Sequence, residues 1–411
     1  MTDPLLYLTY LGLMLLIGII CSLIAKKLRI PNYLLLILVG IGVSNITYKG
    51  APIVQFSPLF LTSTAILALA TLVFDASSRF KIKEFDALSI SALKLTIIFI
   101  IINSIILALA TYLLYKPISP LLVILFATAM SGTSPSAILT ALKGGAKIKV
   151  FEILEIESIL NTPLIVLIPF LILDILRNLQ EKFVLSDLLD QIGPFAQQFI
   201  TGVGAGVFIG LIFFRIMRKR YSPTLSPLAL IVAAVLAYTI AEHLGGNGVL
   251  AVTTMGLFFG NIYIEHKKKL QEFSETFSLI LEILVFVLIG IIIKIPLTLI
   301  FFTGSLALFS ILILVRFISI ELSFPKQFAF KERLFMTLNI PKGIATAVVA
   351  FTLATYTISG IKLILDLILA FIIYSIILST IITRFSKFFV KVEAIQEETF
   401  EVKEFKKKSK K

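Results

Sequence analysis

Long apolar runs dominate this chain and constrain its fold more than any other feature. A helix needs about 20 apolar residues to cross the hydrocarbon core of a bilayer, and this chain carries enough of them for about 13 helices. Its residues are 58% hydrophobic and 15% charged, whereas soluble domains average about 45–50% and about 25%. We therefore predict an all-α polytopic membrane protein. The runs cover 5–24, 31–46, 57–77, 91–115, 119–141, 150–176, 194–216, 224–243, 247–264, 275–293, 296–322, 332–356 and 361–384.

The basic residues support this count and predict a topology. Lysine and arginine concentrate on the cytoplasmic side of membrane proteins, and 28 of the 37 in this chain follow odd-numbered spans or lie in the C-terminal tail. Six follow even-numbered spans, and Lys94, Arg316 and Lys342 lie within spans. We expect an external N-terminus, a transmembrane domain over 1–384 and a basic cytoplasmic tail over 385–411. The first run lacks a basic n-region, so we interpret it as a retained span and not as a signal peptide.

The same features disfavour several other classes of protein. The net charge of +13 collects on one side of the predicted membrane, so it gives no sign of nucleic-acid binding. Cys21 is the single cysteine, and His243 and His266 are the two histidines, which are too few for an internal disulfide or a histidine cluster around a transition metal. We find no P-loop and no Gly-x-Ser-x-Gly motif, so we expect neither an enzyme nor a bound cofactor.

Two spans contain sequences that interrupt a helix. Residues 131–136 read Ser-Gly-Thr-Ser-Pro-Ser in the fifth span, and residues 339–343 read Asn-Ile-Pro-Lys-Gly in the twelfth. Proline lacks a backbone donor and disfavours helix at the preceding residue. An offset of seven spans places the two segments in opposite orientations, which indicates inverted repeats with a substrate site where the broken helices meet. A proline kink is the simpler alternative for either segment alone.

A polar strip runs along the sixth span. Glu157 and Asn161 are four residues apart, as are Ser158 and Thr162, so all four share one helix face that we expect to point away from lipid. Arg316 in the eleventh span is the natural counter-ion for Glu157, because a guanidinium suits a buried carboxylate. An ion pair that only ties two helices together is the alternative interpretation.

Other charged residues in the spans are more ambiguous. Asp75 lies near the cytoplasmic end of the third span, four residues before an arginine, and is either part of an interfacial ion pair or an acid that funnels ions. Asp174, Glu282 and Asp366 stand alone in apolar runs, where we favour roles in helix contacts or at helix ends. Lys342 either places a positive charge where a broken helix ends or takes part in substrate coupling.

The motifs also form an ordered set. A family of transporters typically has Thr-Asp-Pro in a broken fifth helix and Glu-Gly-Glu-Ser-Leu-Leu-Asn-Asp in the sixth. The corresponding residues here are Thr133-Ser134-Pro135, Glu155-Ile156-Glu157-Ser158-Ile159-Leu160-Asn161-Thr162, Gly248-Val249-Leu250-Ala251-Val252, Arg316 and Pro341-Lys342-Gly343. Nearly all of the chain resembles the monovalent cation:proton antiporter superfamily, most closely its NhaP-like Na+/H+ antiporter branch. The resemblance implies a dimeric 13-helix transporter with inverted repeats and two broken, crossing helices, an NhaA/NhaP-like antiporter fold.

This chain departs from the family pattern at the two positions that carry the exchange. In the family, Na+ and H+ compete for the aspartate of Thr-Asp-Pro and for the aspartate after the asparagine, whereas this chain has Ser134 and Thr162. Hydroxyl and carbonyl oxygens suit a hard cation, but a neutral serine or threonine exchanges no proton at physiological pH. The resemblance implies a site for Na+ and none for a transition metal. The candidate residues of this site are Thr133, Ser134, Glu157, Ser158, Asn161 and Thr162, and Arg316 and Lys342 are candidates for supporting it.

Three functions remain open at this point. The leading hypothesis is a Na+ or Li+/H+ antiporter of the cell membrane that works by alternating access, in which Glu157 or Asp75 takes over proton handling. The second is an uncoupled channel-like or regulatory membrane protein on the same fold, because the site has lost its acids. The third is transport of an anion or organic solute attracted to Lys342, Arg316 and the ends of broken helices.

Overall fold

A computed structural model of the chain describes residues 4–390 except 29, 49–50, 53, 55, 82–86, 117, 135–148, 179–191, 297 and 326. The described residues form helices joined by short connections, together with one small hairpin. The helices are α1 (Pro4–Leu28), α2 (Asn32–Ser44), α3 (Pro58–Ser78), α4 (Ala87–Leu114), α5 (Pro120–Ala129), α7 (Lys149–Asn178), α9 (Ile192–Lys219), α10 (Leu225–His243), α11 (Gly248–Asn261), α12 (Lys267–Ile292), α13 (Leu299–Ser323), α14 (Phe330–Leu338), α15 (Ile344–Leu353), α16 (Ile361–Arg384) and α17 (Ser386–Phe389). The hairpin pairs β1 (Thr47–Tyr48) antiparallel with β2 (Ala51–Pro52).

The helices confirm the predicted all-α membrane architecture. Within the described ranges, nine helices are long and apolar enough to cross a membrane, and four more are apolar but shorter. Together they account for the predicted spans, with α14 and α15 sharing the twelfth. α12 begins at Lys267, ahead of the predicted residue 275, because hydropathy registers only the apolar part of a helix whose first turns are polar.

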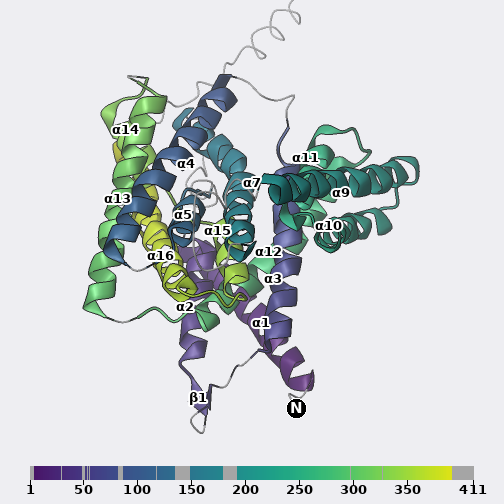
Figure 1. The fold of residues 1–411 in the computed structure, drawn as a ribbon, viewed down its shortest axis with the longest axis horizontal. Helices are drawn as coiled ribbons and strands as arrows, with labels where there is room; N and C mark the ends of the chain where they lie inside the picture. The colour runs from purple at the N-terminus through teal and green to yellow at the C-terminus, as the bar shows by residue number, and fades with distance from the viewer. Residues whose placement is uncertain are drawn as a thin grey trace, which may run out of the picture.

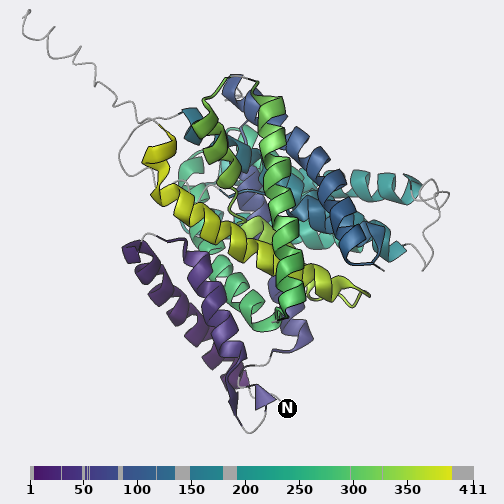
Figure 2. The same cartoon turned by 90° about the vertical axis from the view of Figure 1, so that its left-hand side faces the viewer.

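The helices gather into groups that position the broken segments. α9, α10 and α11 pack together on one side of the molecule, while α4, α13 and α16 lie on the other (Figure 1). α3 contacts α11 and α12, and α15 packs against α3, α7 and α12. α1 and α2 run side by side, and α2 packs along α12 (Figure 2). The side chains of α1 are exposed and apolar along much of their length, as expected for a surface that faces lipid.

The predicted helix interruptions are present in the described residues. α14 ends at Leu338 and α15 begins at Ile344, so residues 339–343 connect the two helices without helical structure. α5 ends at Ala129, and residues 130–134 continue outside a helix. Pro135 and Ser136, which the sequence assigns to the same interruption, lie outside the described residues. A ten-residue helix such as α5 is about 15 Å long, so it spans about half of the hydrocarbon core.

The chain after α16 is partly packed onto the helices. α16 ends at Arg384, the predicted boundary of the transmembrane domain, and α17 follows it directly. The ring of Phe389 lies 6.1 Å from that of Phe335 on α14, and Val390 is buried. The first residues of the predicted tail therefore contact the helical domain, whereas 391–411 lie outside the described residues and the division into two domains stays a prediction.

Candidate functional site

The two interruptions meet, and their backbones are hydrogen-bonded to one another. The amide nitrogen of Ser134 donates to the carbonyl oxygen of Pro341 over 2.9 Å. Gly343 lies so close that a Cβ at this position would overlap the side chain of Ser134. Residues from two spans more than 200 positions apart thus form one crossing, and the absence of a side chain at Gly343 permits the approach.

Lys342 lies at the centre of this crossing. Its side chain is 0% exposed, and its ammonium donates to the carbonyl oxygens of Met130 and Gly132 over 2.6 and 2.8 Å. These carbonyls directly follow the last turn of α5, where the helix dipole favours a positive charge. The backbone nitrogen of Lys342 donates to the hydroxyl of Ser375 on α16 over 3.0 Å. Within the described residues, both hydrogen bonds of the ammonium go to carbonyls and neither goes to a carboxylate.

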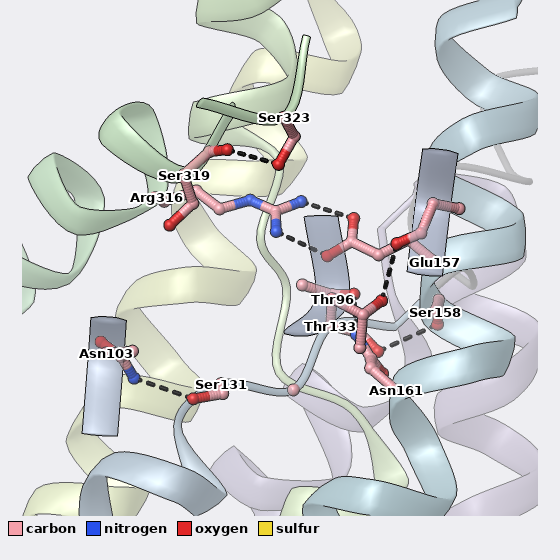
Figure 3. A network of polar contacts seen from close by, with 12 residues as sticks. Thr96, Asn103, Ser131, Thr133, Glu157, Ser158, Asn161, Arg316, Ser319 and Ser323 are labelled. Carbon is pink, nitrogen blue, oxygen red and sulfur yellow. Dashed lines mark hydrogen bonds and ion pairs between the residues drawn. The ribbon is translucent and has the colours of Figure 1, made fainter. Parts of the chain in front are cut away.

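The predicted ion pair between α7 and α13 is present. Arg316 binds Glu157 through both guanidinium Nη atoms, over 2.5 and 2.6 Å, and both side chains are fully buried (Figure 3). The Arg316 guanidinium also lies 4.9 Å from the ring centre of Phe99, and the Lys342 ammonium lies 5.9 Å from the same ring. In a bidentate, buried pair of this kind each side chain supplies the counter-charge of the other.

The polar strip of α7 binds the interrupted segment of the fifth span. The hydroxyl of Ser158 donates to the carbonyl oxygen of Thr133 over 2.9 Å, and the Asn161 amide nitrogen donates to the Thr133 hydroxyl over 2.7 Å (Figure 3). The Asn161 amide oxygen is buried without a hydrogen-bond donor. The Thr162 hydroxyl donates to the carbonyl of Ser158 within the same helix. The crossing therefore holds a buried oxygen acceptor that has no partner among the described residues.

Asp75 takes part in a different contact. It lies near the end of α3, where one carboxyl oxygen accepts from the Nη2 and Nε atoms of Arg79 over 2.8 and 3.3 Å. Arg79 in turn lies 3.7 Å from the Glu275 carboxylate of α12. The interfacial ion pair that was one of the two alternatives for Asp75 is thus present. These contacts of Asp75 lie at the boundary of α3 and α12 and not at the crossing.

Two residues that sequence reasoning missed support the crossing. The Asn103 amide nitrogen in α4 donates to the carbonyl of Ala127 and to the hydroxyl of Ser131, over 2.8 and 3.0 Å (Figure 3). Phe99, one turn earlier in α4, lies beneath both buried cations. Asn103 had a signal in the sequence, because an amide inside an apolar span needs a partner; Phe99 had none, because the chain has 35 phenylalanines.

The family model for the transmembrane domain of sodium/hydrogen exchangers matches residues 12–388. This chain belongs to that family. The protein is therefore a multi-pass membrane transport protein of the NhaP-like branch and not an enzyme.

Individual relatives agree with this assignment. "Probable Na(+)/H(+) antiporter 2" of Methanocaldococcus jannaschii is 27% identical over 84% of this chain and 84% of its own length. The K(+)/H(+) antiporter NhaP2 of a Shewanella species is 24% identical over 78% of this chain and 56% of its own length. The structure of the sodium proton antiporter MjNhaP1 of M. jannaschii at pH 8 covers 92% of this chain and 97% of its own, with a TM-score of 0.72 at 21% identity, and thus shares its fold.

Proposed function

We propose that this protein exchanges Na+ or Li+ for H+ by alternating access, with the cation bound where the two interruptions cross. The proposal is supported by the family membership and by the oxygen-rich crossing. Hydroxyl, carbonyl and amide oxygens are the ligands that hard cations prefer. The proposed ligands are Thr133, Ser134, Ser158, Asn161 and Thr162 together with the carbonyl oxygens of Met130 and Gly132.

The group that carries the proton must differ from the usual aspartates. Glu157 is engaged by Arg316 through both oxygens, so protonating it would leave a buried guanidinium without its counter-charge. Asp75 is bound to Arg79 near the end of α3. Among the described residues, the titratable group that remains is the ammonium of Lys342, which contacts the interrupted segment of the fifth span. We therefore assign proton handling to Lys342 in preference to Glu157 or Asp75.

The single observation that carries the proposal is the position of the Lys342 ammonium on the carbonyls of Met130 and Gly132. An ammonium and a metal cation both bind carbonyl oxygens, so they compete for the same two acceptors. Loss of a proton leaves a neutral amine, which frees the acceptors and removes one positive charge. A bound Na+ or Li+ restores that charge. Competition of this kind couples one cation to one proton and keeps the total charge of the site constant.

Transport in everted membrane vesicles tests the proposal. Na+ or Li+ added to vesicles with an acidic interior should dissipate the pH gradient for the wild-type chain and for Lys94→Met, which changes an exposed lysine of α4. Lys342→Met should abolish the response. The proposal fails if wild-type vesicles respond to neither cation at any pH from about 5 to about 9, or if Lys342→Met responds like the wild type. Adding K+ in parallel tests selectivity, since one relative is named a K(+)/H(+) antiporter.

An uncoupled, channel-like or regulatory protein is the second candidate. Ser134 and Thr162 favour it, because they replace the two acids on which the family resemblance places the exchange. Cation flux that ignores an imposed pH gradient would support this candidate over exchange. In either case we propose a homodimer in the cell membrane with a cytoplasmic C-terminus, as the family resemblance and the distribution of basic residues favour.

A further inference from the structure

Glu282 is a carboxyl group deep in a membrane helix that the proposed exchange does not use. It lies 15 residues after Lys267 and ten before Ile292, the two ends of α12. At 1.5 Å per residue these separations are about 22 and about 15 Å, so Glu282 lies well inside the hydrocarbon core. A charged side chain at such a depth costs about 2.5–3.5 kcal/mol on insertion scales. The group therefore needs either a partner or a proton.

No partner for Glu282 is found in the described part of the chain. Its side chain is partly buried, and it makes no hydrogen bond or ion pair there. α12 packs against α1, α2, α3, α10 and α15. The titratable residues of these helices are Tyr7, Tyr10, Cys21, Lys26, Lys27, Tyr33, Asp75, Tyr238, Glu242 and His243. None of them forms a hydrogen bond or an ion pair with the Glu282 carboxyl, so a proton is the remaining way to avoid a buried charge.

Two serines continue from Glu282 toward the Lys267 end of α12. Ser278 and Ser274 precede Glu282 by four and eight residues, so the three side chains lie on one helix face at intervals of about 6 Å. Ser278 is 6% exposed and Ser274 is 0% exposed, and neither hydroxyl has a hydrogen-bond partner in the described part of the chain. These hydroxyls are thus able to donate to, or accept from, a molecule that is not part of the protein.

The two hydroxyls differ from many others in this molecule. Many buried serines and threonines in its other described helices donate to the backbone carbonyl four residues earlier, although the hydroxyls of Ser77 and Thr352 also lack a partner. Examples are Thr96, Thr111, Thr253, Ser319 and Ser323, whose hydroxyl oxygens lie 2.6–3.0 Å from those carbonyls. Ser274 and Ser278 do not make this bond. The hydroxyls of Ser274 and Ser278 are therefore not used in a bond to their own helix.

The row of polar groups ends at the surface of the molecule. Ser274 lies beside the Asp75 carboxyl of α3. Neither its hydroxyl nor the second oxygen of that carboxyl has a hydrogen-bond partner among the described residues. Asp75 binds Arg79, which is partly exposed and lies 3.7 Å from the exposed Glu275. Polar groups spaced about one helical turn apart thus lead from the exposed end of α3 and α12 to Glu282. We call Asp75, Ser274, Ser278 and Glu282 the α12 stripe.

We propose that Glu282 is a proton-binding site inside the membrane and that the α12 stripe is its route to the aqueous side at the Lys267 end of α12. A carboxylate without a counter-ion accepts a proton, and hydroxyls one turn apart can pass that proton along through intervening water. The site is separate from the crossing, because the Lys342 ammonium bonds to the carbonyl oxygens of Met130 and Gly132 and makes no hydrogen bond or ion pair with Glu282. The inference does not depend on cation exchange, since protonation can be measured without transport.

Labelling with dicyclohexylcarbodiimide tests the site in the purified full-length protein. The reagent adds to a protonated carboxylic acid: the proton moves to a carbodiimide nitrogen, the carboxyl oxygen bonds to the central carbon, and the acyl group then migrates to nitrogen with no group leaving. We expect mass spectrometry to find the label on Glu282, with a yield that falls between about pH 5 and about pH 9. Glu282→Gln should remove this label. A native protein unlabelled at Glu282 at every pH, or labelled equally at every pH, would overturn the proposal.

A pair of serine variants tests the route. After a rapid change to alkaline pH, labelling of Glu282 in the wild type should stop as the proton leaves. Ser278→Ala should delay this loss several-fold, while Ser310→Ala, an exposed serine of α13 that bonds to its own helix, should not. Equal rates in the two variants would refute the α12 stripe as the route, even if Glu282 itself is labelled.

Discussion

Removal of Arg316 is expected to destabilise the protein far more than removal of a comparable arginine near the surface. Arg316→Met would leave the fully buried Glu157 carboxylate without the two hydrogen bonds that now satisfy it. Breaking one side of a buried ion pair costs about 3–5 kcal/mol, because the remaining charge is uncompensated. Arg333 makes a similar contact with Glu321, but these side chains are 19% and 32% exposed. Arg333→Met should therefore cost at most about 1 kcal/mol.

The cost converts into a measurable shift of the unfolding temperature. With an unfolding entropy of about 2.1 cal/mol/K per residue, a loss of about 3–5 kcal/mol lowers the midpoint by about 3–6 °C for a chain of this length. Cys21 provides the assay, because it is the single cysteine and is 5% exposed. A maleimide dye that fluoresces on reaction should report its exposure on heating. The same measurement on Arg333→Met should shift the midpoint by about 1 °C or less.

The double variant Arg316→Met with Glu157→Leu separates a lost interaction from an uncompensated charge. Replacing both partners of a buried pair by apolar residues is often nearly neutral, so the double variant should regain most of the stability that Arg316→Met loses. Equal midpoints for Arg316→Met and the wild type would refute the assignment of the pair as buried and mutually dependent. A double variant less stable than Arg316→Met would show that Glu157 has another essential partner.

Two further predictions concern the crossing. Gly343→Ala should lower the free energy of unfolding by about 1–3 kcal/mol, because the new side chain would overlap that of Ser134. Adding Ser134→Gly should restore the unfolding temperature of that variant. A Gly343→Ala protein as stable as the wild type would contradict the close approach. Ser134→Asp combined with Thr162→Asp should lower the Na+ concentration for half-maximal exchange by about tenfold, or about 1.4 kcal/mol, when measured in everted vesicles. An inert but folded double variant would show that the crossing has diverged beyond the two missing acids.

Hydropathy and charge were sufficient to predict much of the fold. Each apolar run predicts a helix because lipid leaves the backbone no other partner than itself, and the helices of the described residues follow those runs. The pair of Glu157 and Arg316 was also predictable, since two opposite charges in apolar spans need one another. The interruption at 339–343 followed from its proline and glycine.

The contacts that define the site could not be predicted in the same way. The bonds from Lys342 to Met130 and Gly132 join a side chain to backbone carbonyls, and every residue has such a carbonyl, so the sequence gives no sign of which ones are used. The α12 stripe could not be predicted, because Glu282 is the only charged residue over 276–293. Glu282 and Asp75 lie on different helices, and only the packing of α12 against α3 places the two serines between them.

Proton release on cation binding tests most directly whether Lys342 couples the two ions. Purified protein in a weakly buffered solution with a pH indicator should release about one proton per bound Na+ or Li+, because the cation replaces the ammonium proton at the carbonyls of Met130 and Gly132. Lys342→Met should release none, and Lys94→Met should behave as the wild type does. Cation binding by the wild type without proton release, or an equal release from Lys342→Met, would contradict the account.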